Sequence, residues 1–136
     1  MSNYFDVTVS GLSFEDVVQF LEEELRKEGF NVITDINIKE TFSTMLGVSF
    51  RKYSIINAYN PTYTYRALHA HDKAGLFLPS SFVVQETEKG EVEVTGIDPI
   101  PAMKPAECDD LILVANQIQR KIRHVLKAIQ YGNFNV

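Results

Sequence analysis

The sequence predicts an α+β protein with two layers, in which a curved five-stranded antiparallel sheet packs against a long C-terminal helix and an N-terminal helix. Three observations predict this class. Five stretches have the composition and patterning of strands, two long stretches repeat apolar residues at helical spacing, and several connections between strands are short. Short connections favour antiparallel pairing, and amphipathic helices must bury their apolar side against a sheet.

The first two elements follow from the start of the chain. Residues 4–11, YFDVTVSG, alternate between apolar and polar side chains, which predicts a half-buried strand. The residues on its apolar face are Phe5, Val7 and Val9. Ser13, with Asp16 three residues later, resembles a capping box and predicts the start of a helix. Apolar residues then recur at helical spacing up to Gly29, a favourable residue for a helix end.

The next segment predicts two strands separated by a short helix. Residues 31–38 return to a period of two, with one face made of Val32, Thr34, Ile36 and Ile38. Residues 39–46, KETFSTML, fit a short amphipathic helix that ends at Gly47. Residues 50–60, FRKYSIINAYN, are apolar on both faces, which predicts an inner strand whose second face is also covered.

The second half predicts a helix, a hairpin and the longest helix. Pro61 suits the first position of a helix over residues 62–71. Residues 80–99 predict a hairpin with its turn at Lys89-Gly90, and a connection rich in proline follows. From about Pro105 the chain predicts a long helix with one apolar stripe. The stripe consists of Leu111, Val114, Ala115, Ile118, Ile122, Val125 and Ile129.

Composition places the chain among single-domain globular proteins. The 136 residues fit one domain, 1–136, and 45% are hydrophobic. The net charge of −5 argues against a nucleic-acid or anionic-membrane partner, because both favour a basic surface. Cys108 is the single cysteine, the N-terminus lacks the pattern of a signal peptide, and no apolar stretch reaches about 18 residues. We therefore expect a cytoplasmic protein without a membrane span.

Several segments resemble the domain-of-unknown-function 302 family. The matching pieces are EEELRKEGFNVITDINIKETF, NAYNP and AGLFLPSSFVVQETEKGEVEVTGIDP, over roughly residues 20 to 100. Within them the dipeptides Gly29-Phe30, Asn60-Pro61, Leu78-Pro79 and Asp98-Pro99 follow the order of the family pattern. The resemblance implies a β-α-β4-α topology like that of TATA-binding-protein-like folds, and a homodimer. It implies no shared activity, since one topology serves many functions.

Histidine and cysteine residues give two hypotheses for chemistry. His69, His71 and Asp72 could share a metal ion, but residues two apart on a helix are about 200° apart, so a helix through Leu68 would separate the histidines. The alternative is a surface or helix-end role. Cys108 lies near a helix start, which favours thiolate, whereas neighbouring carboxylates oppose it. It could be reactive, or a small half-buried filler.

Polar and aromatic residues at the end of the third strand suggest a binding site. Asn57, Tyr59 and Asn60 place amide and phenol groups beside apolar residues. They could contact a ligand, or Asn57 could be a satisfied core amide and Asn60 an Asx-type turn. The surrounding aromatic residues fit a dimer contact, a ligand pocket or a cover for the sheet. These aromatic residues are Tyr59, Tyr63, Tyr65 and Phe77.

The leading functional hypothesis is a small homodimeric protein that binds a small molecule. The predicted ligand contacts are Asn57, Tyr59, Asn60, His69, His71 and Cys108. Alternatives are a redox-linked or metal- or haem-associated enzyme that uses His71 or Cys108, and a structural partner in a larger complex. The sequence does not identify a cofactor, and the basic run Arg120, Lys121, Arg123, His124 and Lys127 is typical of a solvated helix end.

Overall fold

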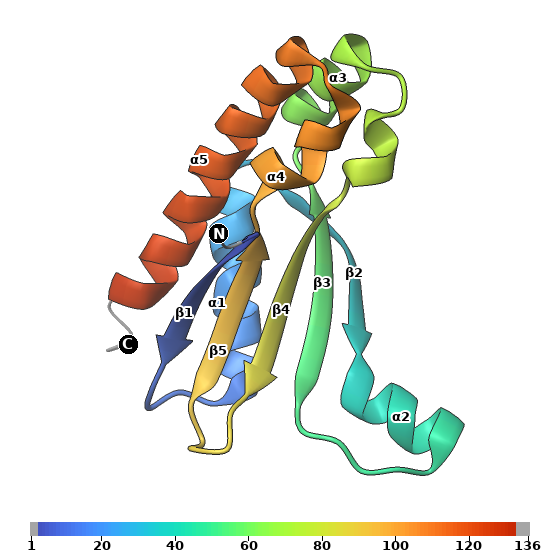
Figure 1. Ribbon diagram of the computed structural model, residues 1–136. Helices are drawn as coiled ribbons and strands as arrows, with labels where there is room; N and C mark the ends of the chain where they lie inside the picture. Colours follow the sequence, from blue (N-terminus) through green and yellow to red (C-terminus); the bar gives the residue numbers. More distant parts are fainter. Residues whose placement is uncertain (1–2, 133–136) are drawn as a thin grey trace.

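One antiparallel sheet of five strands organises the computed structural model, which describes residues 3–132 (Figure 1). The strands are β1 (Tyr4–Val9), β2 (Asn31–Asn37), β3 (Tyr53–Tyr59), β4 (Ser80–Glu86) and β5 (Val92–Ile97). The larger helices are α1 (Phe14–Lys27), α2 (Ile38–Leu46), α3 (Pro61–Ala70) and α5 (Asp109–Tyr131). Short helical segments are η1 (Ala74–Phe77), α4 (Pro99–Met103) and η2 (Lys104–Ala106). The strand order is β1-β5-β4-β3-β2, and the predicted α+β class is confirmed.

The helix ends follow the local chemistry expected from the sequence. Ser13 Oγ accepts a hydrogen bond from the backbone N–H of Asp16 at 3.0 Å, so α1 begins where the capping pattern predicts. Gly29 has φ of 88°, a left-handed conformation that lets the chain leave α1. Pro61 is the first residue of α3, where its missing N–H has no cost to the helix.

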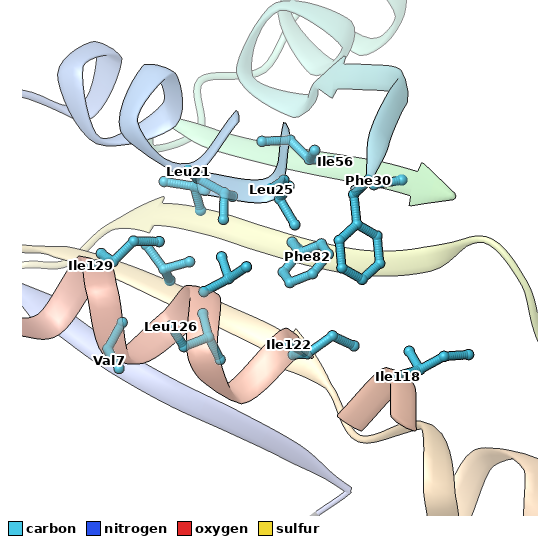
Figure 2. Packing of buried hydrophobic residues seen from close by; sticks show 14 of the residues in the cluster. Val7, Leu21, Leu25, Phe30, Ile56, Phe82, Ile118, Ile122, Leu126 and Ile129 are labelled. Atoms are coloured by element: carbon cyan, nitrogen blue, oxygen red, sulfur yellow. The ribbon is translucent and has the colours of Figure 1, made fainter. Parts of the chain in front are cut away.

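The hydrophobic core lies on one face of the sheet, under α1 and α5. Val7, Val94 and Val84 are partners in the register of neighbouring strands, and all three are buried. Leu21 and Leu25 of α1 enter the same layer from above the sheet (Figure 2). The whole predicted stripe of α5 is buried, which confirms its role as the main cover of the sheet. Burial of this apolar surface is the main contribution to folding.

Gly96 lets α5 approach the sheet closely. A Cβ atom at residue 96 would lie 3.0 Å from Ile122 Cγ2, 3.1 Å from Phe82 Cε2 and 3.2 Å from Leu126 Cδ1. These distances are shorter than normal van der Waals separations between carbon atoms. Glycine at this strand position therefore makes room for two side chains of α5 and one of β4.

The second strand and the proline-rich connection differ from the predictions. A bulge between Val32 and Thr34 reverses the alternation, so Val32 pairs with buried Ala58 while Thr34 pairs with Asn57 on the other face. The single predicted face for these residues is therefore wrong, and Ile38 is already the first residue of α2. Asp98 Oδ1 accepts from the N–H of Ile100 and caps α4, a helix that the sequence did not predict.

The opposite face of the sheet carries the residues that alternate with the core and lies away from α1 and α5. We call it the open face, and most of its side chains are half-buried within the single chain. Its residues are Asp6, Thr34, Ile36, Tyr53, Ile55, Asn57, Tyr59, Ser81, Val83, Gln85, Glu93 and Thr95. The sequence predicts a cover for the second face of β3, yet the long helices contribute none. Figure 1 shows α2 projecting beyond the end of β2 and α3 at the opposite end of the sheet.

We predict that Gly96→Ala destabilises the protein by about 1–3 kcal/mol, because the added methyl group forces α5 away from the sheet. Urea unfolding followed by circular dichroism measures the change. Gly75→Ala is the matched control, since nothing lies nearer than 4.0 Å to a Cβ there. Equal effects of the two substitutions would contradict the close approach of α5.

Candidate binding sites

Asn60 joins the end of β3 to the end of α1. Its side chain is buried, and Asn60 Nδ2 donates to the backbone carbonyl of Glu28 at 3.1 Å. The predicted Asx-type turn is wrong, because the Asn60 side chain makes no capping hydrogen bond with α3. A Cβ on Gly29 would lie 3.3 Å from the same amide nitrogen. Asn60 is thus seated against the α1 turn.

Glu28 extends this junction to α5. Its side chain is 18% exposed and its carboxylate accepts from Lys121 Nζ at 3.2 Å. The other carboxylate oxygen lies 2.9 Å from His124 Nδ1. Glu28 therefore connects three elements, through its carbonyl to Asn60 and through its carboxylate to α5.

Asn57 lies on the open face with both ends of its amide in hydrogen bonds. Asn57 Nδ2 donates to Thr34 Oγ1 at 2.9 Å, and Ser81 Oγ donates to Asn57 Oδ1 at 2.9 Å. The three side chains form a polar ladder across β2, β3 and β4. Tyr59 is half-buried two residues further along β3. The amide is therefore satisfied by side chains, but the predicted core position is wrong, because Asn57 is half-buried on the open face.

The two histidines separate at the end of α3. This helix continues to Ala70, so His69 is on its surface, where its ring centroid lies 4.4 Å from that of Tyr65. His71 follows the helix, and its Nδ1 accepts from the N–H of Lys73 at 3.1 Å. Asp72 pairs with Lys73. In the described part of the chain, no group of three or more His, Cys, Asp or Glu residues is arranged to hold a metal ion.

Cys108 occupies the N-cap position of α5 and contacts the end of α3. Its thiol donates to the carbonyl oxygen of Ala70 at 3.5 Å, and the residue is half-buried against the core. This contact brings the start of α5 beside the backbone between His69 and His71. Of the six predicted ligand contacts, Asn57, Tyr59 and Asn60 therefore lie at the end of β3. The other three, His69, His71 and Cys108, lie where α3 meets the start of α5. The four members with hydrogen bonds are Asn57, Asn60, His71 and Cys108, and each bonds to a different partner.

A basic groove between α5 and β1 was missed by sequence analysis. We call it the α5–β1 groove; its volume is about 520 Å³. Its lining residues are Phe5, Asp6, Val7, Arg120, Arg123, His124, Leu126, Lys127 and Gln130. The basic residues recur three and four positions apart, which places them on one side of the helix. That spacing was visible in the sequence, but the neighbouring strand β1 is far away along the chain.

The fold and its surfaces define a two-layer α+β domain whose long elements follow a β-α-β4-α order. Residues 5–129 match the model of the family described as domain of unknown function DUF302, and the chain belongs to that family. A similar solved structure is that of an uncharacterized conserved DUF302 protein from Bacillus stearothermophilus, with a TM-score of 0.86 and 24% identity. The match covers 93% of this chain and 98% of that chain, and it shows a shared fold.

A search of curated proteins finds no match to the chain. Between residues 3 and 132, none of the helices has the length and apolar character required to cross a bilayer.

We predict that Asn60→Ala lowers the free energy of unfolding by about 1–2 kcal/mol, because the hydrogen bond from the buried Asn60 amide to the Glu28 carbonyl is lost. Asn116→Ala is the matched control: its amide also donates to a backbone carbonyl, that of Ile112, but on an exposed helix surface. Urea unfolding should show little loss for the control. A loss as large in Asn116→Ala would show that burial of the junction is unimportant.

Proposed function

We propose that the chain is a small cytoplasmic binding module that works as a homodimer and holds a small molecule. The observation that carries the dimer is the open face of the sheet. Its central residues Ile55 and Val83 are apolar, lie opposite one another in the register, and belong to the face of the sheet that points away from α1 and α5. A second copy of this chain is the occupant we propose.

Polar groups on the open face are already paired with one another. Besides the Asn57 ladder, Thr95 Oγ1 donates to Asp6 Oδ1 at 3.0 Å. Gln85 Nε2 donates to Glu93 at 3.2 Å and Gln85 Oε1 accepts from Arg51 Nε at 3.0 Å. Covering a polar group is costly chiefly when it loses its hydrogen bonds. These pairs therefore lower the cost of burying the face against a partner.

The area of the open face indicates how far the contact must extend. Five strands of six or seven residues cover roughly 24 by 22 Å, or about 500 Å², at the usual strand spacing and rise. Stable interfaces bury about 800 Å² on each partner. The area of the open face alone is smaller than this, so a stable dimer contact needs an adjoining surface.

The α2 arm, residues 38–48, supplies that adjoining surface. Met45 and Leu46 are 76% and 66% exposed, and neighbouring exposed apolar side chains are typical of interaction surfaces. Ile36, opposite Ile55 in the register, lines the same shallow groove as Met45. The arm also meets the open face through aromatic rings that run from Phe42 to Phe50 to Tyr53. Open face and arm together form one continuous surface, in which apolar side chains lie among polar groups that are already paired.

We predict that the purified protein sediments as a dimer at micromolar concentration and that Val83→Glu makes it monomeric. The substitution would bury an unpaired carboxylate at the centre of the contact. Analytical ultracentrifugation measures the mass. Leu113→Glu is the control, because Leu113 is also exposed but lies on α5, away from the open face.

A monomeric wild-type protein would contradict the homodimer and leave the open face to a different partner. Dissociation by Leu113→Glu and retention of the dimer by Val83→Glu would move the contact to α5. Circular dichroism confirms that each variant is folded, so that loss of the dimer is not confused with unfolding.

For the small molecule we keep the contacts predicted from the sequence, Asn57, Tyr59, Asn60, His69, His71 and Cys108. Support comes from chain connectivity, because β3 leads through Asn60 directly into α3. Further support comes from the Cys108 thiol, which lies against the α3 backbone at Ala70. Asn57 and Tyr59 are the members that also belong to the open face, so a ligand there would adjoin the dimer contact.

We predict that native mass spectrometry of protein purified without denaturation detects a bound small molecule. Asn57→Ala combined with His71→Ala should remove it, because each replacement deletes a polar contact of the predicted site. Gln19→Ala, an exposed change on α1, should retain it. A bare polypeptide mass for the wild type, or equal retention in all three proteins, would refute this ligand site.

A further inference from the structure

We infer that the α5–β1 groove is a binding site for a small organic anion that carries at least two negative charges beside an apolar group, such as a phosphate monoester. This site lies apart from the six sequence-predicted contacts and does not depend on the proposed dimer. Its volume of about 520 Å³ is typical of small-molecule sites.

The charge of the groove opposes that of the protein. Three basic side chains, those of Arg120, Arg123 and Lys127, line it, although the whole chain has a net charge of −5. None of the three forms an ion pair with a carboxylate of residues 3–132. The lining includes one acid, Asp6, which already accepts a hydrogen bond from Thr95. The groove therefore concentrates uncompensated positive charge that would attract an anion.

The helix dipole does not account for these cations. Cations stabilise a helix when they lie in its last turn, and the effect decreases beyond that turn. The last turn of α5 contains no basic residue, and Arg120 and Arg123 lie well before Tyr131. The position of these cations is better explained by the groove that they form with strand β1.

The groove also has an apolar floor. Val7 and Leu126 are buried beneath it, and the Arg123 guanidinium carbon lies 5.4 Å from the centre of the Phe5 ring. Such a contact holds the planar guanidinium over the aromatic face, while its N–H groups remain able to donate to an anion. An apolar substituent on the ligand would pack on the same floor.

His124 lies at the margin of the groove, and the position of its ring is restrained. Its Nδ1 lies 2.9 Å from the Glu28 carboxylate, which also accepts from Lys121. Glu28 therefore engages one ring nitrogen and restrains the imidazole at the margin of the groove. The Glu28 charge is itself paired, so it opposes an anion less than a free carboxylate would.

Size decides between a small molecule and a nucleic acid. Arg120 and Lys127 are seven residues apart, about 10 Å along the helix axis. This length suits one or two anionic groups, whereas nucleic-acid sites contact many phosphates along a strand and are strongly basic overall. With the net charge of −5, the groove favours a small organic anion.

The test is a titration of ¹⁵N-labelled protein with phenyl phosphate, followed by backbone amide shifts at low salt. We expect saturable shifts at residues 5–7 and 120–130, and weaker binding of inorganic phosphate, which lacks the apolar ring. Arg120→Gln with Arg123→Gln should weaken binding at least about tenfold, since hydrogen bonds to charged groups are lost. Asp6→Asn should strengthen it, because it removes the negative charge from the lining.

Lys89→Gln with Lys104→Gln is the matched control, since it removes the same charge from exposed sites outside the groove and should change affinity less than about twofold. If the double arginine variant does not fold, Gln130→Glu tests the site by adding a carboxylate to its lining, and it should weaken binding. Absence of saturable shifts in the groove, equal weakening by the control pair, or weaker binding by Asp6→Asn would each overturn the site.

Discussion

The packing of α5 on β5 at Gly96 is the constraint on which the rest of the structure depends. Because residue 96 has no side chain, Ile122 and Leu126 reach the sheet beside Phe82. The apolar stripe of α5 then covers β1 and β5, while α1 packs against β4 and β2 (Figure 2). One face of the sheet is thereby enclosed by helices, and the open face remains accessible to solvent or to a partner molecule.

This one-sided core decides where binding can occur. Apolar residues on the core face stabilise the fold. The open face, the α2 arm and the outer side of α5 remain accessible to ligands or other proteins. The Glu28 junction holds these parts in place, since one residue links the end of α1 to Asn60 and to α5. The proposed dimer surface and the proposed anion groove thus use different parts of a shared scaffold and adjoin at Asp6 on the β1 edge.

For the candidate ligand site, the sequence indicated which polar residues would matter but not which partners they would contact. Asn57 was correctly expected to need partners, yet those partners, Thr34 and Ser81, come from strands on either side and depend on the β2 bulge. Asn60 looked like a turn residue because asparagine before proline favours local hydrogen bonds. Its amide instead donates a hydrogen bond to the backbone carbonyl of Glu28, a residue distant in the sequence.

The sequence by itself determined the α+β class, the order of the strands and longer helices, the α1 cap at Ser13 and the buried stripe of α5, because these depend on periodicity and on neighbouring residues. Tertiary structure alone decided the β2 bulge, the pairing of Glu28 with α5 and the apposition of Arg123 with Phe5. Those features depend on which distant segments meet, and side-chain periodicity along one element contains no information about the element that will face it.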